Sequence, residues 1–127
     1  ITWREVSASS ALSADARDIL ASLPTRRGGR EVLSDIAREI PSTGDACRRL
    51  GEVVDLLEAH GVADSVVIDL GVLRDWGYYT GVVFEAYAPG VSRPAALGGR
   101  YDALLGRFGA DRPAVGVGVL LDPLHEA

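Results

Sequence analysis

Three stretches in the first half of the chain repeat apolar residues at helical spacing, at 16–23, 32–40 and 46–57. Apolar residues three and four positions apart share one face of an α-helix, so each stretch predicts an amphipathic helix. Ser13 stands at the N-cap position of the first stretch, and Pro24 and Pro41 end the first and the second. Gly61 follows the third, where a left-handed residue commonly closes a helix. The first half therefore predicts three helices that each bury one face.

The second half changes to the pattern of strands and turns. Residues 65–70 form a short segment that is rich in β-branched residues and bounded by glycine, which predicts a strand. Residues 80–88 form a longer predicted strand that ends at Pro89-Gly90. Too few residues separate these runs for a helical crossover, which predicts that they pair as antiparallel neighbours. Residues 101–108 return to helical spacing, and 114–121 are predicted to form a last apolar strand. This order of elements predicts an α+β fold with helices on an antiparallel sheet.

The composition is that of one folded domain. The 127 residues fall within the size range of a single core, and 47 % of them are hydrophobic and 24 % charged, which excludes a disordered chain. All 13 basic residues are arginine, and 18 acidic residues leave a net charge of −5. An acidic chain without a basic stripe is a poor match for a nucleic-acid-binding module, so no nucleic-acid partner is expected.

Cysteine, histidine and hydropathy set the expected compartment. A single cysteine, Cys47, excludes an internal disulfide, and the two histidines lack the spacing of a metal site, so neither metal nor cofactor is expected. No apolar run approaches the ~18 residues that cross a bilayer, and no leader pattern opens the chain. These features predict a cytoplasmic protein without a membrane partner. The start at Ile1, without a methionine, suggests a piece of a longer protein.

The candidate chemistry lies between the predicted strands. Arg74 stands near the junction of two strands, Tyr78 and Tyr79 open the second, and Tyr101 follows a proline-containing connection. A guanidinium holds a carboxylate or phosphate through two hydrogen bonds, and a tyrosine hydroxyl orients a polar ring, so these residues suit a small-molecule pocket. Adjacent strand residues point to opposite faces, which predicts that only one of the two neighbouring tyrosines faces such a pocket. The alternative is that the tyrosines pack in the core or at an edge and the arginine is solvated.

Two glycine pairs admit more than one interpretation. Gly98-Gly99 allows a backbone to approach a ligand closely or forms the turn before the next helical stretch, and the local sequence favours the turn. Gly116 and Gly118 resemble the start of a dinucleotide fingerprint but lack its third glycine and its helix. No phosphate-binding loop or nucleophile elbow is present in the sequence. The residues taken singly therefore predict no catalytic group.

Three blocks in order carry a specific resemblance, at 73–85 (LRDWGYYTGVVFE), 98–104 (GGRYDAL) and 113–116 (PAVG). Together they look like the second half of the histidyl-tRNA synthetase catalytic core, and the clear match covers about 64–125. The resemblance implies a class II synthetase-type antiparallel sheet. Residues 63–127 would then form the C-terminal portion of that sheet core, and the helical segment 1–62 would occupy the place of the family's helical insertion.

The resemblance also implies a histidine-binding site. Carried over by position, Arg74 would lie by the histidine carboxylate and the activating phosphate, Tyr79 would contact the imidazole, and Tyr101 would close the pocket wall. Tyr78 matches the first tyrosine of the family segment, and the glycine pair begins its Gly-Gly-Arg-Tyr-Asp segment. The predicted ligand-binding residues are Arg74, Tyr78, Tyr79, Gly98, Gly99 and Tyr101.

Two departures from the synthetase pattern bear on activity. The segment after Arg74 reads Asp75-Trp76-Gly77, which keeps the family's arginine and loses its aspartate. Where a synthetase carries an ATP-binding arginine after its closing strand, this chain carries Asp122-Pro123. Proline can neither donate a hydrogen bond nor neutralise phosphate. Losing such a charge-assisted contact costs roughly 10²-fold or more in rate, so amino-acid activation is not expected.

A synthetase-like core without that arginine resembles the ATP phosphoribosyltransferase regulatory subunit family. This resemblance implies a non-catalytic protein that joins a short-form catalytic subunit in the first step of histidine biosynthesis, supports its activity and makes it sensitive to histidine. It also implies a homodimer formed through parts outside this chain. Two alternatives are a fragment of a divergent histidyl-tRNA synthetase and a bare α+β scaffold that acts only through protein contacts.

Overall fold

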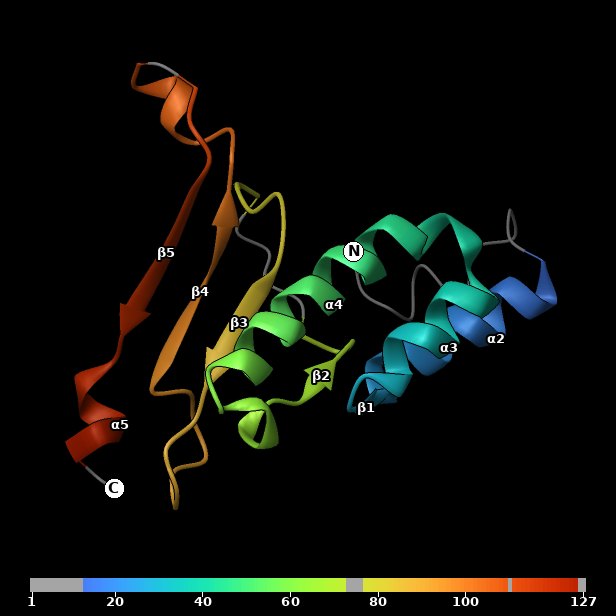
Figure 1. Ribbon diagram of the computed structural model, residues 1–127, viewed down its shortest axis with the longest axis horizontal. Coiled ribbons are helices and arrows are strands. Elements are labelled where there is room, and N and C mark those ends of the chain that lie inside the picture. Colours follow the sequence, from blue (N-terminus) through green and yellow to red (C-terminus); the bar gives the residue numbers. More distant parts are fainter. Residues whose placement is uncertain (1–12, 73–76, 110, 126–127) are drawn as a thin grey trace. The chain divides into compact units, whose positions relative to one another are not determined.

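The computed structural model describes residues 13–72, 77–109 and 111–125 (Figure 1). The chain divides into two compact units, Ile1–Leu73 and Arg74–Ala127. The sequence placed a change from helical to sheet segments after residue 62. The compact units divide later because the short strand that follows residue 62 pairs within the first unit.

The described residues of the first unit form helices and one short strand pair. Its elements are α2 (Ala14–Ser22), η1 (Leu23–Thr25), β1 (Arg27–Gly28), α3 (Glu31–Glu39), η2 (Pro41–Thr43), α4 (Gly44–Ala59), η3 (Ala63–Ser65) and β2 (Ile68–Asp69). The Ser13 side chain caps α2 by accepting a hydrogen bond from the Ala16 amide at 3.2 Å. Gly61 follows α4 with a φ of +73°, a left-handed conformation that favours glycine. The three predicted helices are confirmed.

The pairing predicted for residues 65–70 is wrong. β2 pairs antiparallel with β1, placing Ile68 opposite Gly28 and Asp69 opposite Arg27. The Leu70 amide extends this contact by donating to the Arg26 carbonyl at 3.0 Å. A short connection excludes a helical crossover to the next strand, but it does not exclude pairing with a segment earlier in the chain, which is what happens here.

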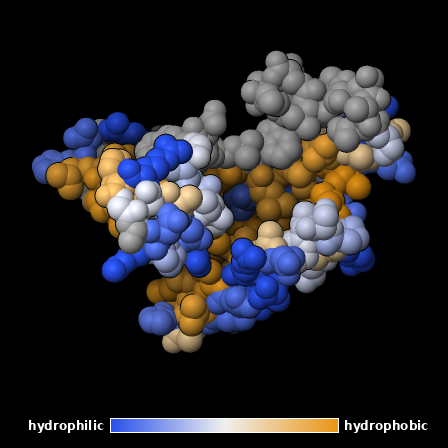
Figure 2. Space-filling model, turned by 90° about the horizontal axis from the view of Figure 1, so that it is seen from above, coloured by the Kyte–Doolittle hydropathy of each residue, from blue (hydrophilic) through white to orange (hydrophobic). Residues whose placement is uncertain are grey.

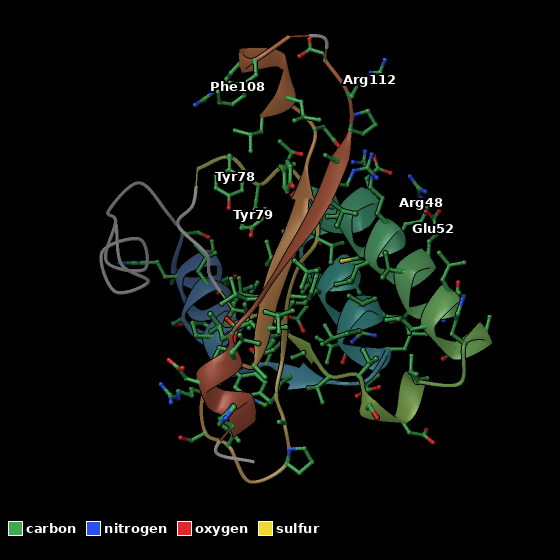
Figure 3. All side chains as sticks on the ribbon, turned by 90° about the vertical axis from the view of Figure 1, so that its left-hand side faces the viewer. Arg48, Glu52, Tyr78, Tyr79, Phe108 and Arg112 are labelled. Carbon is green, nitrogen blue, oxygen red and sulfur yellow. The ribbon has the colours of Figure 1, made fainter. Side chains whose placement is uncertain are left out.

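The core of the first unit joins α3, α4 and β2. Val32, Leu33 and Ile36 of α3 are buried, as are Val54 of α4 and Ile68 of β2. Packing of apolar side chains at helical spacing removes them from water, which is the main stabilising contribution to such a unit. The opposite faces of the helices carry ion pairs with water-exposed side chains, such as Arg48 with Glu52 (2.7 Å, Figure 3).

The second unit is a three-stranded antiparallel sheet in the order β3-β4-β5 (Figure 1). Its elements are β3 (Val83–Ala86), β4 (Ala96–Tyr101), η4 (Leu105–Arg107), β5 (Ala114–Val119) and α5 (Leu121–His125). The register places Phe84, Gly98 and Val117 opposite one another across the three strands, and Val83, Gly99 and Gly116 in the neighbouring row. The predicted antiparallel sheet in an α+β fold is confirmed.

Two local predictions in this unit are wrong. The pair Gly98-Gly99 is not a turn: both residues are buried in the middle of β4. The helix predicted over 101–108 is reduced to the single turn η4, since Tyr101 still belongs to β4 and Gly106 and Gly109 weaken helix formation. Phe108 lies just after this turn, at the far end of the β4–β5 hairpin, with 84 % of its surface exposed (Figure 3).

Candidate functional site

Three of the predicted site residues form one aromatic cluster. The ring centroids of Tyr78 and Tyr79 are 4.6 Å apart, and the Tyr101 ring lies 5.6 Å from the first and 6.3 Å from the second. Figure 3 shows the two neighbouring tyrosines side by side before the sheet begins. The basis for expecting only one of them to face a pocket does not hold, because β3 begins at Val83 and strand alternation does not apply at 78–79.

Glycines on one face of the sheet make room for the tyrosine rings. A β-carbon on Gly99 would lie 2.7 Å from Cε1 of Tyr79, and one on Gly116 would lie 2.5 Å from the Tyr101 hydroxyl. Real β-carbons do not approach other atoms so closely, so the rings lie directly on the backbone of β4 and β5. Gly99 therefore allows a close approach of the Tyr79 ring, while an approach of a ligand to this backbone stays a prediction.

Gly98 is separated from this cluster although it neighbours Gly99 in sequence. A β-carbon on Gly98 would lie 2.7 Å from Cζ of Phe84 and close to the backbone of Val117, on the opposite face of the sheet. Alternation along a strand requires this separation. Of the predicted pair, only Gly99 therefore lies beside the tyrosine cluster.

Sequence reasoning missed Gly116 as a companion of the tyrosines. It was considered only for a dinucleotide fingerprint, in which glycines approach a phosphate. The signal that could have found it is the alternation of small and large residues over 114–119, which gives β5 one glycine-lined face. The strand register that sets Gly116 beside Gly99 is not visible in the sequence.

Backbone hydrogen bonds tie the tyrosine segment to the end of β4. The Thr80 amide donates to the Arg100 carbonyl at 2.9 Å, and the Thr80 hydroxyl accepts from the Asp102 amide at 2.9 Å. The Arg100 guanidinium donates to the Asp102 carboxylate at 2.9 Å. These contacts hold the segment that carries Tyr78 and Tyr79 beside Tyr101, so the cluster is fixed by backbone as well as by ring packing.

The surroundings of Tyr78 favour its neutral phenol. The side-chain hydrogen bond with Tyr79, then loss of hydration and the nearby phenols, raise the pKa of Tyr78 to about 12. A hydrogen bond to the neutral form of an acid raises its pKa in this way. At neutral pH Tyr78 therefore offers an uncharged hydroxyl group beside the aromatic faces of the cluster, which suit a flat polar ring or a cationic one.

The predicted anion-binding residue, Arg74, lies outside the described residues. The described residues of the first unit line a hollow of about 380 Å³ that includes Arg26 and Glu31, and another of about 300 Å³ in which Arg30 pairs with Asp55. The tyrosine cluster belongs to neither, since it lies on a face of the sheet.

Among the described residues no group of histidine, cysteine and carboxylate side chains could hold a metal ion. No helix there has the length and apolar character to span a membrane.

An antiparallel sheet that carries tyrosines on a glycine-lined face, preceded by a helical segment, is the architecture implied for a class II synthetase-type core. Residues 2–124 match the family described as histidyl-tRNA synthetase. The chain belongs to this family.

Within this family, the chain is similar to ATP phosphoribosyltransferase regulatory subunits. An ATP phosphoribosyltransferase regulatory subunit of Geobacter sulfurreducens is 44 % identical over 117 residues, which cover 89 % of this chain and 26 % of the relative. One from Bacillus velezensis is 37 % identical and covers 100 % of this chain and 33 % of the relative. The predicted resemblance to regulatory subunits is therefore confirmed. The chain spans about a quarter to a third of the length of the curated relatives it matches.

A solved structure agrees in three dimensions. The crystal structure of an ATP phosphoribosyltransferase regulatory subunit/histidyl-tRNA synthetase from Bacillus halodurans superposes with a TM-score of 0.86 at 35 % identity, over 97 % of this chain and 33 % of that one. A histidine–tRNA ligase subunit from Alicyclobacillus acidocaldarius gives a TM-score of 0.59 at 36 % identity, over 93 % of this chain and 34 % of that one. The synthetase-like fold assignment is confirmed by both.

Proposed function

We propose that this chain is part of a non-catalytic regulatory subunit of ATP phosphoribosyltransferase, which acts in the first step of histidine biosynthesis. The subunit binds the catalytic subunit, supports its activity and makes it sensitive to histidine. The observation that carries the proposal is the 37–44 % identity to proteins of that name over most of the chain. Pro123, at the place of the synthetase family's ATP-binding arginine, supports a role without amino-acid activation.

The tyrosine cluster is proposed as part of the histidine site. The phenols of Tyr78 and Tyr79 supply hydrogen-bonding groups for an imidazole, while Gly99 and Gly116 let the rings of Tyr79 and Tyr101 lie against the strands. Arg74 is proposed to hold the histidine carboxylate. Histidine that binds one packing of the subunit better than another shifts the equilibrium between them, with a typical coupling of ~1–3 kcal/mol.

The subunit is also proposed to work in the cytoplasm, as a homodimer formed through parts outside this chain and without a nucleic-acid partner. The acidic net charge of −5 supports the last point, because an acidic chain is repelled by phosphates.

Reconstitution tests the regulatory role. The full-length protein that contains this chain is added to the short-form catalytic subunit, and transfer of the phosphoribosyl group is followed with and without histidine. We expect a faster rate on adding the protein and inhibition by histidine only when it is present. A catalytic subunit that is equally active and equally sensitive without it would contradict the proposal.

Calorimetry of histidine binding to the same protein tests the site. Tyr79→Phe removes a hydroxyl of the cluster, and we expect histidine to bind about 10-fold more weakly, the usual consequence of losing one hydrogen bond to a polar ligand. Tyr87→Phe is the matched control, since Tyr87 is 57 % exposed and bonds Glu85 instead. Equal affinity in the Tyr79→Phe and parent proteins would remove Tyr79 from the site.

The alternative function is amino-acid activation by a divergent histidyl-tRNA synthetase, which the description of the matching family favours. Histidine-dependent pyrophosphate exchange by the full-length protein distinguishes the two. We expect none above background because the ATP-binding arginine is replaced. Exchange at a rate typical of an enzyme would establish the synthetase instead.

A further inference from the structure

Thr80 connects the two halves of the tyrosine cluster. It follows Tyr79 directly in the chain, and it bonds the residues on both sides of Tyr101. Its amide donates to the Arg100 carbonyl at 2.9 Å, and its hydroxyl accepts from the Asp102 amide at 2.9 Å. One residue therefore holds two points of the backbone around Tyr101 at a set distance from Tyr79.

The backbone pairing is irregular at this place. In a hydrogen-bonded antiparallel pair, two opposite residues exchange both of their bonds. Here the Arg100 amide donates to the Val82 carbonyl at 2.9 Å, whereas the Arg100 carbonyl accepts from Thr80. The two bonds lie on either side of Gly81, as in a β-bulge, and bulges beside binding sites commonly redirect a side chain. The regular ladder of β3 begins only after this point, so it does not fix the direction of Tyr79.

The Arg100 side chain supports the same contact. Its Nε lies 2.9 and 3.1 Å from the two carboxylate oxygens of Asp102. Its aliphatic part lies against Gly81, where a β-carbon would be only 3.1 Å from Cβ and from Cδ of Arg100. Arg100 and Asp102 flank Tyr101 in the Gly-Gly-Arg-Tyr-Asp block, in which only the glycines and the tyrosine were predicted to bind a ligand. These contacts hold the Asp102 amide where the Thr80 hydroxyl accepts from it.

We propose that Thr80 is a positioning residue of the tyrosine cluster: its hydroxyl, by accepting from the Asp102 amide, sets the place of Tyr101 relative to Tyr79. The ring centroids of these two tyrosines are 6.3 Å apart. Both rings lie over glycines, which contribute no side chain to hold them in place. The contacts of Thr80 supply this constraint. For ligand binding the proposal rests on the proposed histidine site, because a ligand that contacts both rings binds best when their spacing is already fixed.

Removing the hydroxyl is expected to change position more than stability. Thr80 is exposed, and hydrophilic side chains, coloured blue, occupy much of the surface seen in Figure 2. Water therefore reaches the Asp102 amide and replaces the lost partner. A water molecule does not hold two segments of the chain at a fixed spacing, so the expected loss falls on the arrangement of the rings.

Calorimetry of histidine binding to the full-length protein that contains this chain tests the role of Thr80. Thr80→Val removes the hydroxyl and keeps the shape of the side chain, and we expect histidine to bind about 5-fold more weakly. Thr80→Ser retains the hydroxyl and should bind histidine like the parent. Thr25→Val is the matched control and should also bind like the parent, since the Thr25 hydroxyl donates to the Ser22 carbonyl at 2.8 Å in the first unit.

A double-mutant cycle with Tyr79→Phe tests whether Thr80 acts through the tyrosines. If the Thr80 hydroxyl matters because it sets the place of the Tyr79 phenol, its removal should cost little once that phenol is gone. We therefore expect Thr80→Val to weaken histidine binding about 5-fold in the parent and clearly less in the Tyr79→Phe protein. A purely structural role of Thr80 would give the same loss in both backgrounds.

Near-ultraviolet circular dichroism follows the tyrosine rings without any ligand. Thr80→Val should change the tyrosine signal, Thr80→Ser should restore it, and Thr25→Val should leave it as in the parent. Thermal unfolding checks that each variant is folded. Thr80→Ala removes the hydroxyl in a second way and takes the place of Thr80→Val if that variant does not fold.

Three results would overturn the proposal: a Thr80→Val protein that keeps the tyrosine spectrum of the parent, an equal loss of binding in Thr80→Val and Thr80→Ser, and additive effects in the double-mutant cycle. A changed spectrum with unchanged histidine affinity would support the positioning role and place the histidine site elsewhere. A parent protein that binds no histidine would overturn the proposed site, and the spectra of the variants would then decide the role of Thr80 by themselves.

Discussion

The two units of the molecule differ in how they use apolar residues. Five of the six buried hydrophobic residues among the described ones lie in the first unit, where α3, α4 and β2 close over them. The second unit contributes only Ala95 to that set, and nine of the twelve large hydrophobic side chains exposed in the described residues belong to it. The helical unit therefore buries its own apolar face, whereas the sheet unit leaves much of its apolar surface open.

The difference indicates different roles for the two units. A unit that completes its own core derives its stability from internal packing. A sheet with glycines and tyrosines on one face and exposed valines on the other has both faces available for ligands or further structure. Among the described residues, most of the exposed apolar side chains and the tyrosine cluster therefore lie in the second unit, which also carries nearly all of the three sequence blocks of the family resemblance.

The largest effect is expected from opening the core of the first unit. Leu33 is 6 % exposed and contacts the cluster formed with Val32, Val54 and Ile68. Leu33→Ala should lower the free energy of unfolding by about 2–4 kcal/mol, through lost burial and the cavity left behind. Leu56→Ala, on the exposed side of α4, is the control and should change it little. Chemical denaturation measures both; equal effects would mean that the first unit lacks the closed core described above.

A smaller effect is expected from filling the space beneath the tyrosines. Gly99→Ala introduces a methyl group 2.7 Å from the Tyr79 ring and 2.9 Å from the Val82 carbonyl. We expect a loss of about 1–3 kcal/mol in the free energy of unfolding and a displaced Tyr79 ring, seen in near-ultraviolet circular dichroism. Gly109→Ala, where a β-carbon would meet nothing within 4 Å, is the control. An unchanged spectrum in Gly99→Ala would contradict the close ring packing.

The helices could be predicted from sequence because their signals are local. Ser13 sets a boundary through its capping side chain, Pro24, Pro41 and Gly61 do so through their backbone preferences, and apolar spacing identified the buried faces. The pairing of β2 with β1 could not be predicted in the same way. It joins residues about 40 positions apart through a two-residue ladder, and such a short strand as β1 has no pattern of its own.

The site was predictable in its residue types but not in its arrangement. The family resemblance selected Tyr78, Tyr79 and Tyr101, which the fold brings together. It could not separate Gly98 from Gly99 without knowing that both lie inside a strand. Gly116 joins the site only through the register of β5 against β4, a long-range property that no single segment encodes.

Alkaline titration tests the second unit at its tyrosine cluster. The raised pKa of Tyr78, about 12 against an ordinary value of 10.0, means that the folded state holds this proton more tightly than the unfolded one. The resulting stabilisation is complete below pH 10 and is lost as the pH rises through 12. Phenolate absorbance should therefore show one late-titrating tyrosine, which Tyr78→Phe removes and Tyr87→Phe leaves. If the late-titrating component were lost in the Tyr87→Phe protein instead, Tyr87 and not Tyr78 would carry the raised pKa, which would contradict the prediction.

The smallest effect is expected at an ion pair on the surface of the first unit. Arg26 binds Glu39 at 2.7 Å, and this hydrogen bond lowers the pKa of the Glu39 carboxyl below its ordinary value of 4.5. A lowered pKa in the folded state contributes stability above pH 4.5 that is lost as the pH falls through the lowered value.

Glu39→Gln should therefore be slightly less stable than the parent at pH 7, and the difference should vanish in acid. The effect is small because water screens a pair whose side chains are 26 % and 32 % exposed. Asp18→Asn is the control, since Asp18 forms no ion pair with a described residue. Thermal unfolding from pH 7 to pH 3 measures all three proteins. If the Glu39→Gln protein remained less stable than the parent in acid, the Glu39 side chain would act through packing and not through its charge. The closed core of this unit would then extend to its outer helical faces.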